Sequence, residues 1–234
     1  MLGNTDRLTR RRLLLTGGVG GAAAALLSSP SAQAARWLAE TPAQPVGPFY
    51  APFKPFSIDS DLLYTPGSTT PASGQVIHLS GRVLDQVGRP LEGARVEIFQ
   101  ANTHGRYNHP RHVNSSLKLD PHFQGFGHDA TDADGGYQFR TIKPGPYPDN
   151  PDWVRPPHIH FVVFPPKDAP WATQMYFDGE DLNRTDLLLN GIPERARHMV
   201  VRPLLAPADG MEASSKRVEF EIVLGRPGVE RSPA

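Results

Sequence analysis

Short alternating runs between proline- and glycine-rich turns constrain this fold more than any other feature of the sequence. Alternation with a period of two is typical of strands with one buried face, and Gly and Pro favour the turns that join them. The 234 residues include 25 Pro and 22 Gly, and the best helical period covers only Asp181–Leu189. The expected strands are Val76–Leu84 with Ala94–Gln100 as its partner, Tyr137–Ile142, His158–Phe164 and Lys216–Leu224. The pattern predicts an all-β sandwich.

The sequence divides into three expected parts. Residues 1–35 join a basic run, Arg10–Arg12, to an apolar stretch and a small-residue site ending at Ala35, as a twin-arginine export signal does. The apolar stretch is shorter than the roughly 20 residues of a spanning helix, so no stable membrane insertion is expected. Residues 36–75 are predicted to form an extended arm, and residues 76–234 the β domain.

The signal predicts an exported protein, periplasmic or extracellular. The twin-arginine pathway carries folded proteins and so suits a chain that loads a metal before export. An ordinary secretory signal or an uncleaved anchor is the alternative interpretation.

Charge and cysteine content exclude several classes of protein. Lys plus Arg and Asp plus Glu both total 24, so no basic surplus indicates a nucleic-acid partner. The absence of cysteine excludes a disulfide scaffold and a thiolate metal site. A metal in this chain would therefore be bound by His, Tyr, Asp or Glu.

His158 and His160 lie two residues apart on an expected strand, so their side chains share one face. Two imidazoles on one face suit Zn, Cu, Fe or Ni. On its own, the pair is equally compatible with two half-buried histidines that hydrogen-bond to backbone carbonyls.

Two tyrosines flank this pair in the sequence. Tyr107 follows an expected strand, and Tyr147 lies between Pro146 and Pro148, which restrict its motion. Loop tyrosines usually cover a core. As a ligand, however, a phenolate is a hard anionic oxygen donor that favours a highly charged cation such as Fe(III), and it has precedent in iron proteins.

Four segments in order resemble the intradiol ring-cleavage dioxygenases, and most of all their protocatechuate 3,4-dioxygenase β subunits. The segments are Gln100–His109, Arg140–Pro148, Arg155–Phe161 and Thr173–Gly179. The resemblance implies a transthyretin-like β-sandwich core with long loops. It also implies a mononuclear non-haem Fe(III) held by Tyr107, Tyr147, His158 and His160.

The same resemblance implies an activity and further site residues. The expected reaction is intradiol cleavage of a catechol-type ring with O2 to a cis,cis-muconate-type diacid. Arg155 and Gln174 would line the substrate pocket, where the permanent charge of Arg155 stabilises developing negative charge. Tyr147 would be displaced by the substrate and accept one of its protons.

Two departures bear on substrate and assembly. Asp149 and Asn150 stand where an arginine that pairs with a substrate carboxylate is expected, which argues against protocatechuate itself, and Val154 looks inserted before Arg155. The segment Thr41–Tyr50 resembles the N-terminus of the partner α subunit. A homo-oligomer is therefore expected, with an α-type partner subunit as the alternative.

Two other functions compete with the dioxygenase. One is a non-catalytic transthyretin-like carrier or binding module. The other is a zinc hydrolase built on the histidine pair, which is weaker because no carboxylate stands at a recognisable ligand spacing. The remaining loop histidines fit no ligand template and are left outside the site: His104, His109, His112, His122 and His128.

Overall fold

Strands form nearly all of the regular structure of this chain. The computed structural model describes residues 37–50, 59–113 and 115–225. All of them belong to the second of two units, Ala35–Ala234. The expected export signal, residues 1–35, lies outside the described residues.

Eleven strands and a few short helices are described. In chain order they are β1 (Val76–Asp85), β2 (Arg95–Phe99), η1 (Pro110–His112), β3 (Phe126–Ala130), β4 (Gly136–Ile142), β5 (Tyr147–Asn150), β6 (Trp153–Arg155), β7 (His158–Phe164), β8 (Trp171–Phe177), η2 (Asp181–Arg184), α1 (Leu187–Gly191), α2 (Glu194–Arg197), β9 (Val201–Arg202), β10 (Lys216–Glu219) and β11 (Ile222–Leu224). The expected helical period at Asp181–Leu189 becomes a 3₁₀ turn and the start of α1, and the predicted all-β class is confirmed.

β1 is the central strand of a four-stranded sheet. It pairs antiparallel with β4, and its other edge pairs in parallel with β10 and then β11. The expected pairing of β1 with Ala94–Gln100 is wrong. Those residues form β2, whose two edges are occupied by β3 and β7 in the other sheet. The short turn after β1 sends the chain across the sandwich, where Val96 and Ile98 share a core with Ile77 and Leu79.

The expected strand Lys216–Leu224 is interrupted at Phe220 and Glu221. There the Phe220 carbonyl turns away and accepts a 2.5 Å hydrogen bond from Tyr137 Oη. A Cβ at Gly81 would lie 1.8 Å from the same carbonyl oxygen, so only glycine allows this approach. The two halves keep one register along β1 despite the break.

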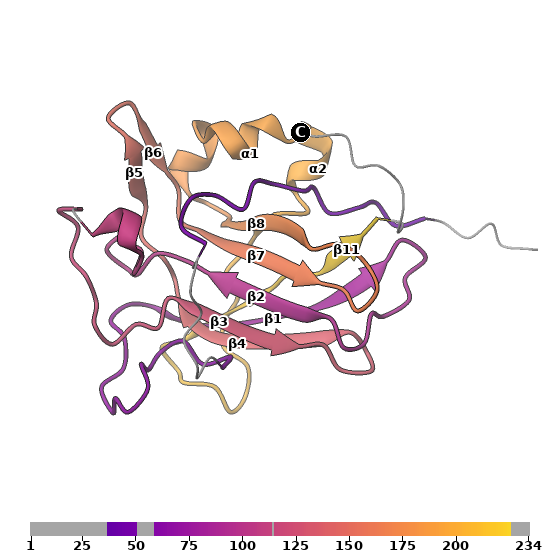
Figure 1. Cartoon of the computed structure of the whole chain (residues 1–234), viewed down its shortest axis with the longest axis horizontal. Coiled ribbons are helices and arrows are strands. Elements are labelled where there is room, and N and C mark those ends of the chain that lie inside the picture. The colour runs from indigo at the N-terminus through magenta and orange to yellow at the C-terminus, as the bar shows by residue number, and fades with distance from the viewer. Residues whose placement is uncertain (1–36, 51–58, 114, 226–234) are drawn as a thin grey trace, which may run out of the picture. The chain divides into compact units, whose positions relative to one another are not determined.

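The second sheet has the order β3-β2-β7-β8-β9, and its strands β2, β7 and β8 are labelled in Figure 1. Its outer face carries the candidate site. On β7, Ile159, Phe161 and Val163 point into the core between the sheets. His158, His160 and Val162 alternate with them and face outward, although all of them are buried. The outer face is therefore covered by other parts of the chain.

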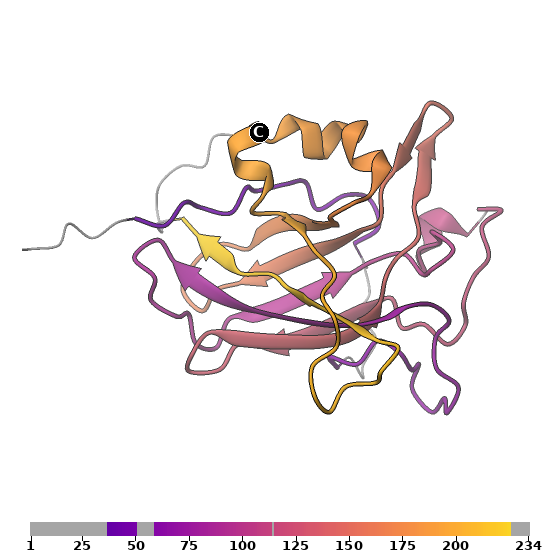
Figure 2. The ribbon, with the colours of Figure 1, turned by 180° about the vertical axis from the view of Figure 1, so that it is seen from behind.

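Segments far apart in sequence cover that outer face. The arm residue Gln44 donates its backbone N–H to Ala172 of β8, and Thr41 donates to Val223 of β11. The helices α1 and α2 follow the same side of the sheet, as Figures 1 and 2 show. No helix in the described ranges is long and apolar enough to span a bilayer.

Candidate metal centre

β7 and its neighbours set the two histidines on the outer face of the sheet. The His160 ring stacks on Phe99 of β2 at 4.2 Å between ring centroids and 9° between planes. On the opposite side, Gln174 and Tyr176 of β8 are the register partners of His160 and His158. Because all of these side chains are at most 2% exposed, the histidines have little freedom to turn.

Two glycines bring the tyrosine loops together. Gly105 has φ +78°, and a Cβ there would lie 2.1 Å from the Pro146 carbonyl oxygen. A Cβ at Gly145 would lie 2.4 Å from the Thr103 carbonyl oxygen. The two loops therefore pack backbone to backbone, and the rings of Tyr107 and Tyr147 meet edge to face at 5.3 Å.

Three of the four expected ligands converge on one point. Tyr107 Oη lies 3.3 Å from His158 Nε2 and 3.1 Å from His160 Nε2, and the two Nε2 atoms are 3.1 Å apart. Donors about 2.1 Å from one metal ion, at bond angles of 90–120°, stand roughly 3.0–3.6 Å apart. The triangle therefore has the dimensions of one face of a coordination shell.

The protonation states of the histidines suit this role. His158 Nδ1 donates to the Pro156 carbonyl oxygen at 2.7 Å, which leaves Nε2 with its lone pair. Burial, and then the charge of Arg155, hold the pKa of His158 well below its usual range. Burial also lowers the pKa of His160, with smaller contributions from His158 and Arg155. Both imidazoles are therefore neutral at pH 7.

The two tyrosines are neutral phenols unless a cation ionises them. Burial raises the pKa of Tyr107 well above its usual range, and the neighbouring Tyr147 adds to the rise. Burial also raises the pKa of Tyr147, against the opposing effect of Arg155. Three polar atoms that can each donate an electron pair, Tyr107 Oη and the two Nε2 atoms, therefore face one point, and a bound cation would be the group that ionises the phenol there.

Tyr147 lies beside the triangle, next to Arg155. It is the register partner of Arg155 in the β5–β6 hairpin, and its ring is 5.8 Å from that of His158. The hairpin register shifts between Pro148 and Asn150. The residue left unpaired by this shift is Asp149, which is exposed, whereas Val154 pairs with Pro148.

Arg155 joins the centre to a buried polar network. Its Nη1 lies 3.1 Å from His158 Nε2, and its Nη2 donates to Gln174 Oε1 at 2.9 Å and to Tyr176 Oη at 3.0 Å. Its Nε donates to Asp186 Oδ2 at 3.0 Å. The structure thus brings the expected pocket residues Arg155 and Gln174 into direct contact beside the expected metal ligands.

The arm closes the outer side of the centre. Gln44 Oε1 accepts from Tyr176 Oη at 2.8 Å, and its Nε2 donates to the Gln174 carbonyl oxygen at 3.1 Å. Gly47, with φ +83°, lies so close to the His160 ring that a Cβ would be 3.3 Å from Cε1. Phe49 stacks on Tyr107 at 4.4 Å between centroids.

Sequence reasoning missed several of these residues. Gln44 and Tyr176 lie in segments that resemble the family, but neither was assigned a role, and Asp186 lies outside those segments. His112, which was left outside the site, accepts the backbone N–H of Tyr107 at 3.0 Å, so it positions the tyrosine without facing the triangle. Tyr50 donates to Glu97 at 2.6 Å and therefore packs beside Phe99.

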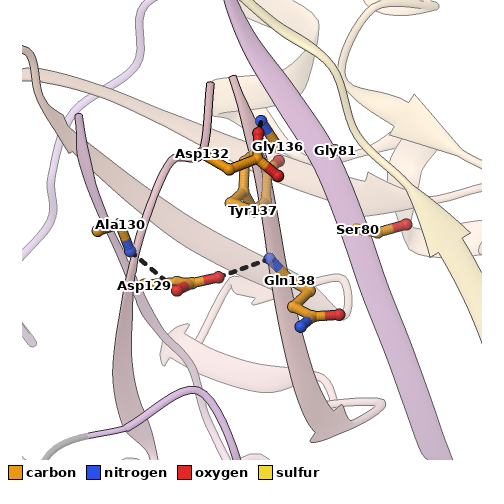
Figure 3. A pocket seen from close by; sticks show the side chains of 8 residues that line it. All are labelled: Ser80, Gly81, Asp129, Ala130, Asp132, Gly136, Tyr137 and Gln138. Carbon is orange, nitrogen blue, oxygen red and sulfur yellow. Dashed lines mark hydrogen bonds between the residues drawn. The ribbon is translucent and has the colours of Figure 1, made fainter. Parts of the chain in front are cut away.

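Other parts of the chain offer weaker sites. Among the described residues, no group of three or more His, Cys, Asp or Glu is placed to hold a metal, so a centre here depends on the tyrosines. A cavity of about 450 Å³ lies over β1, β3 and β4 (Figure 3). Its carboxylates, Asp129 and Asp132, already accept backbone N–H groups of Gln138 and Gly136, which accounts for them as turn and strand contacts.

Comparison with known proteins identifies a family for this chain. The family described as Dioxygenase matches residues 46–226. The protocatechuate 3,4-dioxygenase β chain of Burkholderia cepacia is 39% identical over 170 residues, covering 71% of this chain and 72% of that protein. The α chain from the same species is 32% identical, covering 70% of this chain and 83% of the relative.

Solved structures of dioxygenases are also similar to this chain. The dioxygenase domain of a dioxygenase–carbohydrate-binding protein fusion from Streptomyces sp. SirexAA-E has a TM-score of 0.60 and 29% identity, over 80% of this chain and 99% of that one. Catechol 1,2-dioxygenase from Pseudomonas arvilla C-1 has a TM-score of 0.60 and 26% identity, over 79% and 62% of the two chains.

This chain and these relatives share one class of protein, the all-β dioxygenases. This chain belongs to the intradiol ring-cleavage dioxygenase family.

Proposed function

We propose that this chain is a mononuclear non-haem Fe(III) enzyme that cleaves a catechol-type ring between its two hydroxylated carbons with O2. The observation that carries the proposal is the triangle of Tyr107 Oη, His158 Nε2 and His160 Nε2, with sides of 3.1–3.3 Å. Tyr147 would be the fourth protein ligand. Two neutral imidazoles and two ionisable phenols are a donor set that neutralises much of the charge of a ferric ion.

When bound, Fe(III) would supply the Lewis acidity that ionises the phenols and activates a chelated catechol toward O2. Tyr147 would accept a proton from a substrate hydroxyl at its Oη, because it is the tyrosine outside the triangle and lies next to Arg155. The charge of Arg155 would then stabilise the negative charge that develops on the substrate. Gln174, held by Arg155 and by the Pro45 carbonyl, would present its amide to the substrate oxygens.

The proposed substrate is a catechol without a ring carboxylate. Asp149 lies in the hairpin that carries Tyr147 and contributes a negative charge that raises the pKa of both tyrosines. The same charge would repel a substrate carboxylate. Protocatechuate is therefore expected to be a poorer substrate than catechol, although the most similar relative described above is a protocatechuate 3,4-dioxygenase chain.

Purified protein tests the proposal directly. We expect about one iron per chain, a broad visible absorption band from tyrosinate-to-iron charge transfer, O2 uptake with catechol and a muconate-type product. A colourless protein that is fully occupied by another metal would contradict the iron assignment. An iron protein that binds catechol without consuming O2 would instead favour the carrier function.

The location and assembly of the chain are proposed on separate grounds. The segment Arg10–Leu15 supports export through the twin-arginine pathway. Replacing Arg10 and Arg11 by lysine should leave the protein in the cytoplasm, and continued export would contradict the assignment.

For assembly we propose a homo-oligomer, because the arm of this same chain covers its own centre. Light scattering of the purified chain checks this.

A further inference from the structure

Asp186 is a buried carboxylate that the proposed reaction does not use. It is 0% exposed and lies at the N-terminus of α1, outside the four segments of family resemblance. Its Oδ2 accepts from Arg155 Nε at 3.0 Å, and its Oδ1 accepts from Arg155 Nη2 at 3.3 Å. The contact joins a residue of the helical segment to a residue of the β5–β6 hairpin.

We propose that Asp186 is a positioning residue that fixes the plane and direction of the Arg155 guanidinium, so that Nη1 points at the metal centre. The proposal rests on the proposed function, since Arg155 is assigned to stabilise charge on the substrate. Asp186 itself touches none of the expected metal ligands in the contacts described above.

The two hydrogen bonds between Arg155 and Asp186 explain why a carboxylate suits this position. Two oxygens that bind Nε and Nη2 hold one edge of the planar guanidinium, which fixes the orientation of the whole group. The remaining nitrogen, Nη1, then lies 3.1 Å from His158 Nε2. Gln174 and Tyr176 bind the same Nη2, but each offers one neutral oxygen and leaves the plane free to rotate.

The balance of buried charge also supports a positioning role for Asp186. The Arg155 side chain is only 3% exposed, and a buried unpaired guanidinium is strongly unfavourable. Asp186 supplies the missing negative charge from the Nε edge, away from the centre. The positive edge that carries Nη1 therefore faces His158 Nε2, on the side of the expected metal centre.

Asp186 is itself held in place from two directions. Its Oδ1 accepts the backbone N–H of Leu189 at 2.8 Å as the cap of α1. Its carbonyl oxygen accepts from Asn190 Nδ2 at 2.8 Å and from the Asn190 backbone N–H at 3.0 Å. Asp186, held at the start of the short helix α1, therefore anchors Arg155 of the β5–β6 hairpin.

The test compares Asp186→Asn with Asp181→Asn in the iron-loaded enzyme. The two changes are chemically identical and five residues apart, but Asp181 is exposed and pairs only with Arg184 in the contacts described. Asp186→Asn should lower kcat by about 10- to 100-fold, as loss of an orienting partner does, and change KM far less. Iron content and the visible band should stay as in the wild type. Asp181→Asn should stay within about twofold of wild-type kcat.

A double variant separates positioning from a general structural effect. In an Arg155→Gln background, Asp186→Asn should cause little further loss of kcat, because the group that it orients is gone. The double variant should also melt at a higher temperature than Asp186→Asn alone, since removing both charges avoids an uncompensated buried guanidinium.

Three results would overturn the proposal: unchanged kcat in Asp186→Asn, loss of iron in parallel with kcat, or full additivity with Arg155→Gln. A wild-type protein without ring-cleaving activity would instead contradict the proposed function. The melting temperatures of the single and double variants would then still show whether Asp186 and Arg155 form a coupled pair.

Discussion

The two faces of the five-stranded sheet are buried by different kinds of contact. The inner face packs apolar side chains against the other sheet, where many neighbours share each contact. The outer face buries polar groups, and the partners of several of them come from the arm, the β5–β6 hairpin or the segment before α1. The inner face therefore tolerates change at a cost in stability, whereas a change on the outer face removes a function.

Neighbouring residues of β7 give the sharpest test of this difference. His160 faces the centre and Phe161 faces the core. His160→Ala should abolish the visible band and reduce ring cleavage to background, because the triangle loses a donor, and the metal-free protein should lose some stability, because the buried ring stacks on Phe99. Iron analysis and O2 uptake measure the effect. Retention of both iron and activity would remove His160 from the centre.

Phe161→Ala should have the opposite effect. Phe161 is 0% exposed and packs on Phe220 at 4.8 Å between centroids. Removal of its ring should destabilise the fold by about 3–5 kcal/mol. Activity per bound iron should persist at temperatures where the variant is folded. Denaturant unfolding and specific activity measure the two quantities, and loss of iron from the folded variant would show that the faces are not independent.

Gln44→Ala tests the contribution of the arm to the outer face. The change removes the acceptor of Tyr176 Oη and the donor to the Gln174 carbonyl. A buried polar group that loses its partner typically costs about 1–3 kcal/mol, so unfolding should occur at lower denaturant concentration. Gln44→Glu serves as the second variant, because it keeps the acceptor and removes the donor. Equal stability of the wild type and Gln44→Ala would show that the arm only rests on the sheet.

A substitution at Glu212 tests the four-stranded sheet, which does not carry the centre. The smallest effect is expected there. A hydrogen bond from its own backbone N–H, followed by those from His78 and Arg140, lowers the pKa of Glu212 from 4.5 to about 2. Since the pKa is lower in the folded state, the contribution to stability is full above pH 4.5 and disappears as the pH falls toward 2. Glu212→Gln should therefore lower the melting temperature slightly at pH 6 and not at pH 2.

This effect is small because the carboxylate is exposed and screened by salt. Thermal melts at several pH values in low and high salt measure it. A difference between Glu212→Gln and the wild type that grows as the pH falls would contradict the assigned direction of the pKa. Activity at neutral pH should be unaffected, since Glu212 lies before β10 and contacts β1 and β4 of the sheet that does not carry the centre.

Local signals in the sequence explain which parts of the fold were predictable. The alternation in β1 and β7 and the turn before β4 are local, and their strands are found as expected. β3 contains Gly127, His128 and Asp129, and β5 contains Pro148, so neither has a strand pattern. The pairing of β2 was wrong because alternation shows that a strand has a buried face and does not show which strand lies beside it.

The centre was predictable for a related reason. His158 and His160 share a strand face, and the two tyrosines lie in segments that resemble the family; the structure brings three of the four side chains together. Asp186, Tyr176 and Gln44 act through contacts with residues up to 132 positions away, as in the Tyr176–Gln44 hydrogen bond. A sequence pattern cannot locate such partners, because their chemistry is ordinary until the fold brings them together.

The pairing of Thr41 with Val223 has a consequence for the order of events in folding. The two residues exchange a pair of hydrogen bonds across 182 positions, and Val223 belongs to a strand that joins β1 in parallel. Pairing at such sequence distance is slow to form, because a long loop must close first. During synthesis, the arm has no Val223 to bind until β11 has left the ribosome. The anchoring of the arm at Thr41 is therefore expected among the last steps of folding.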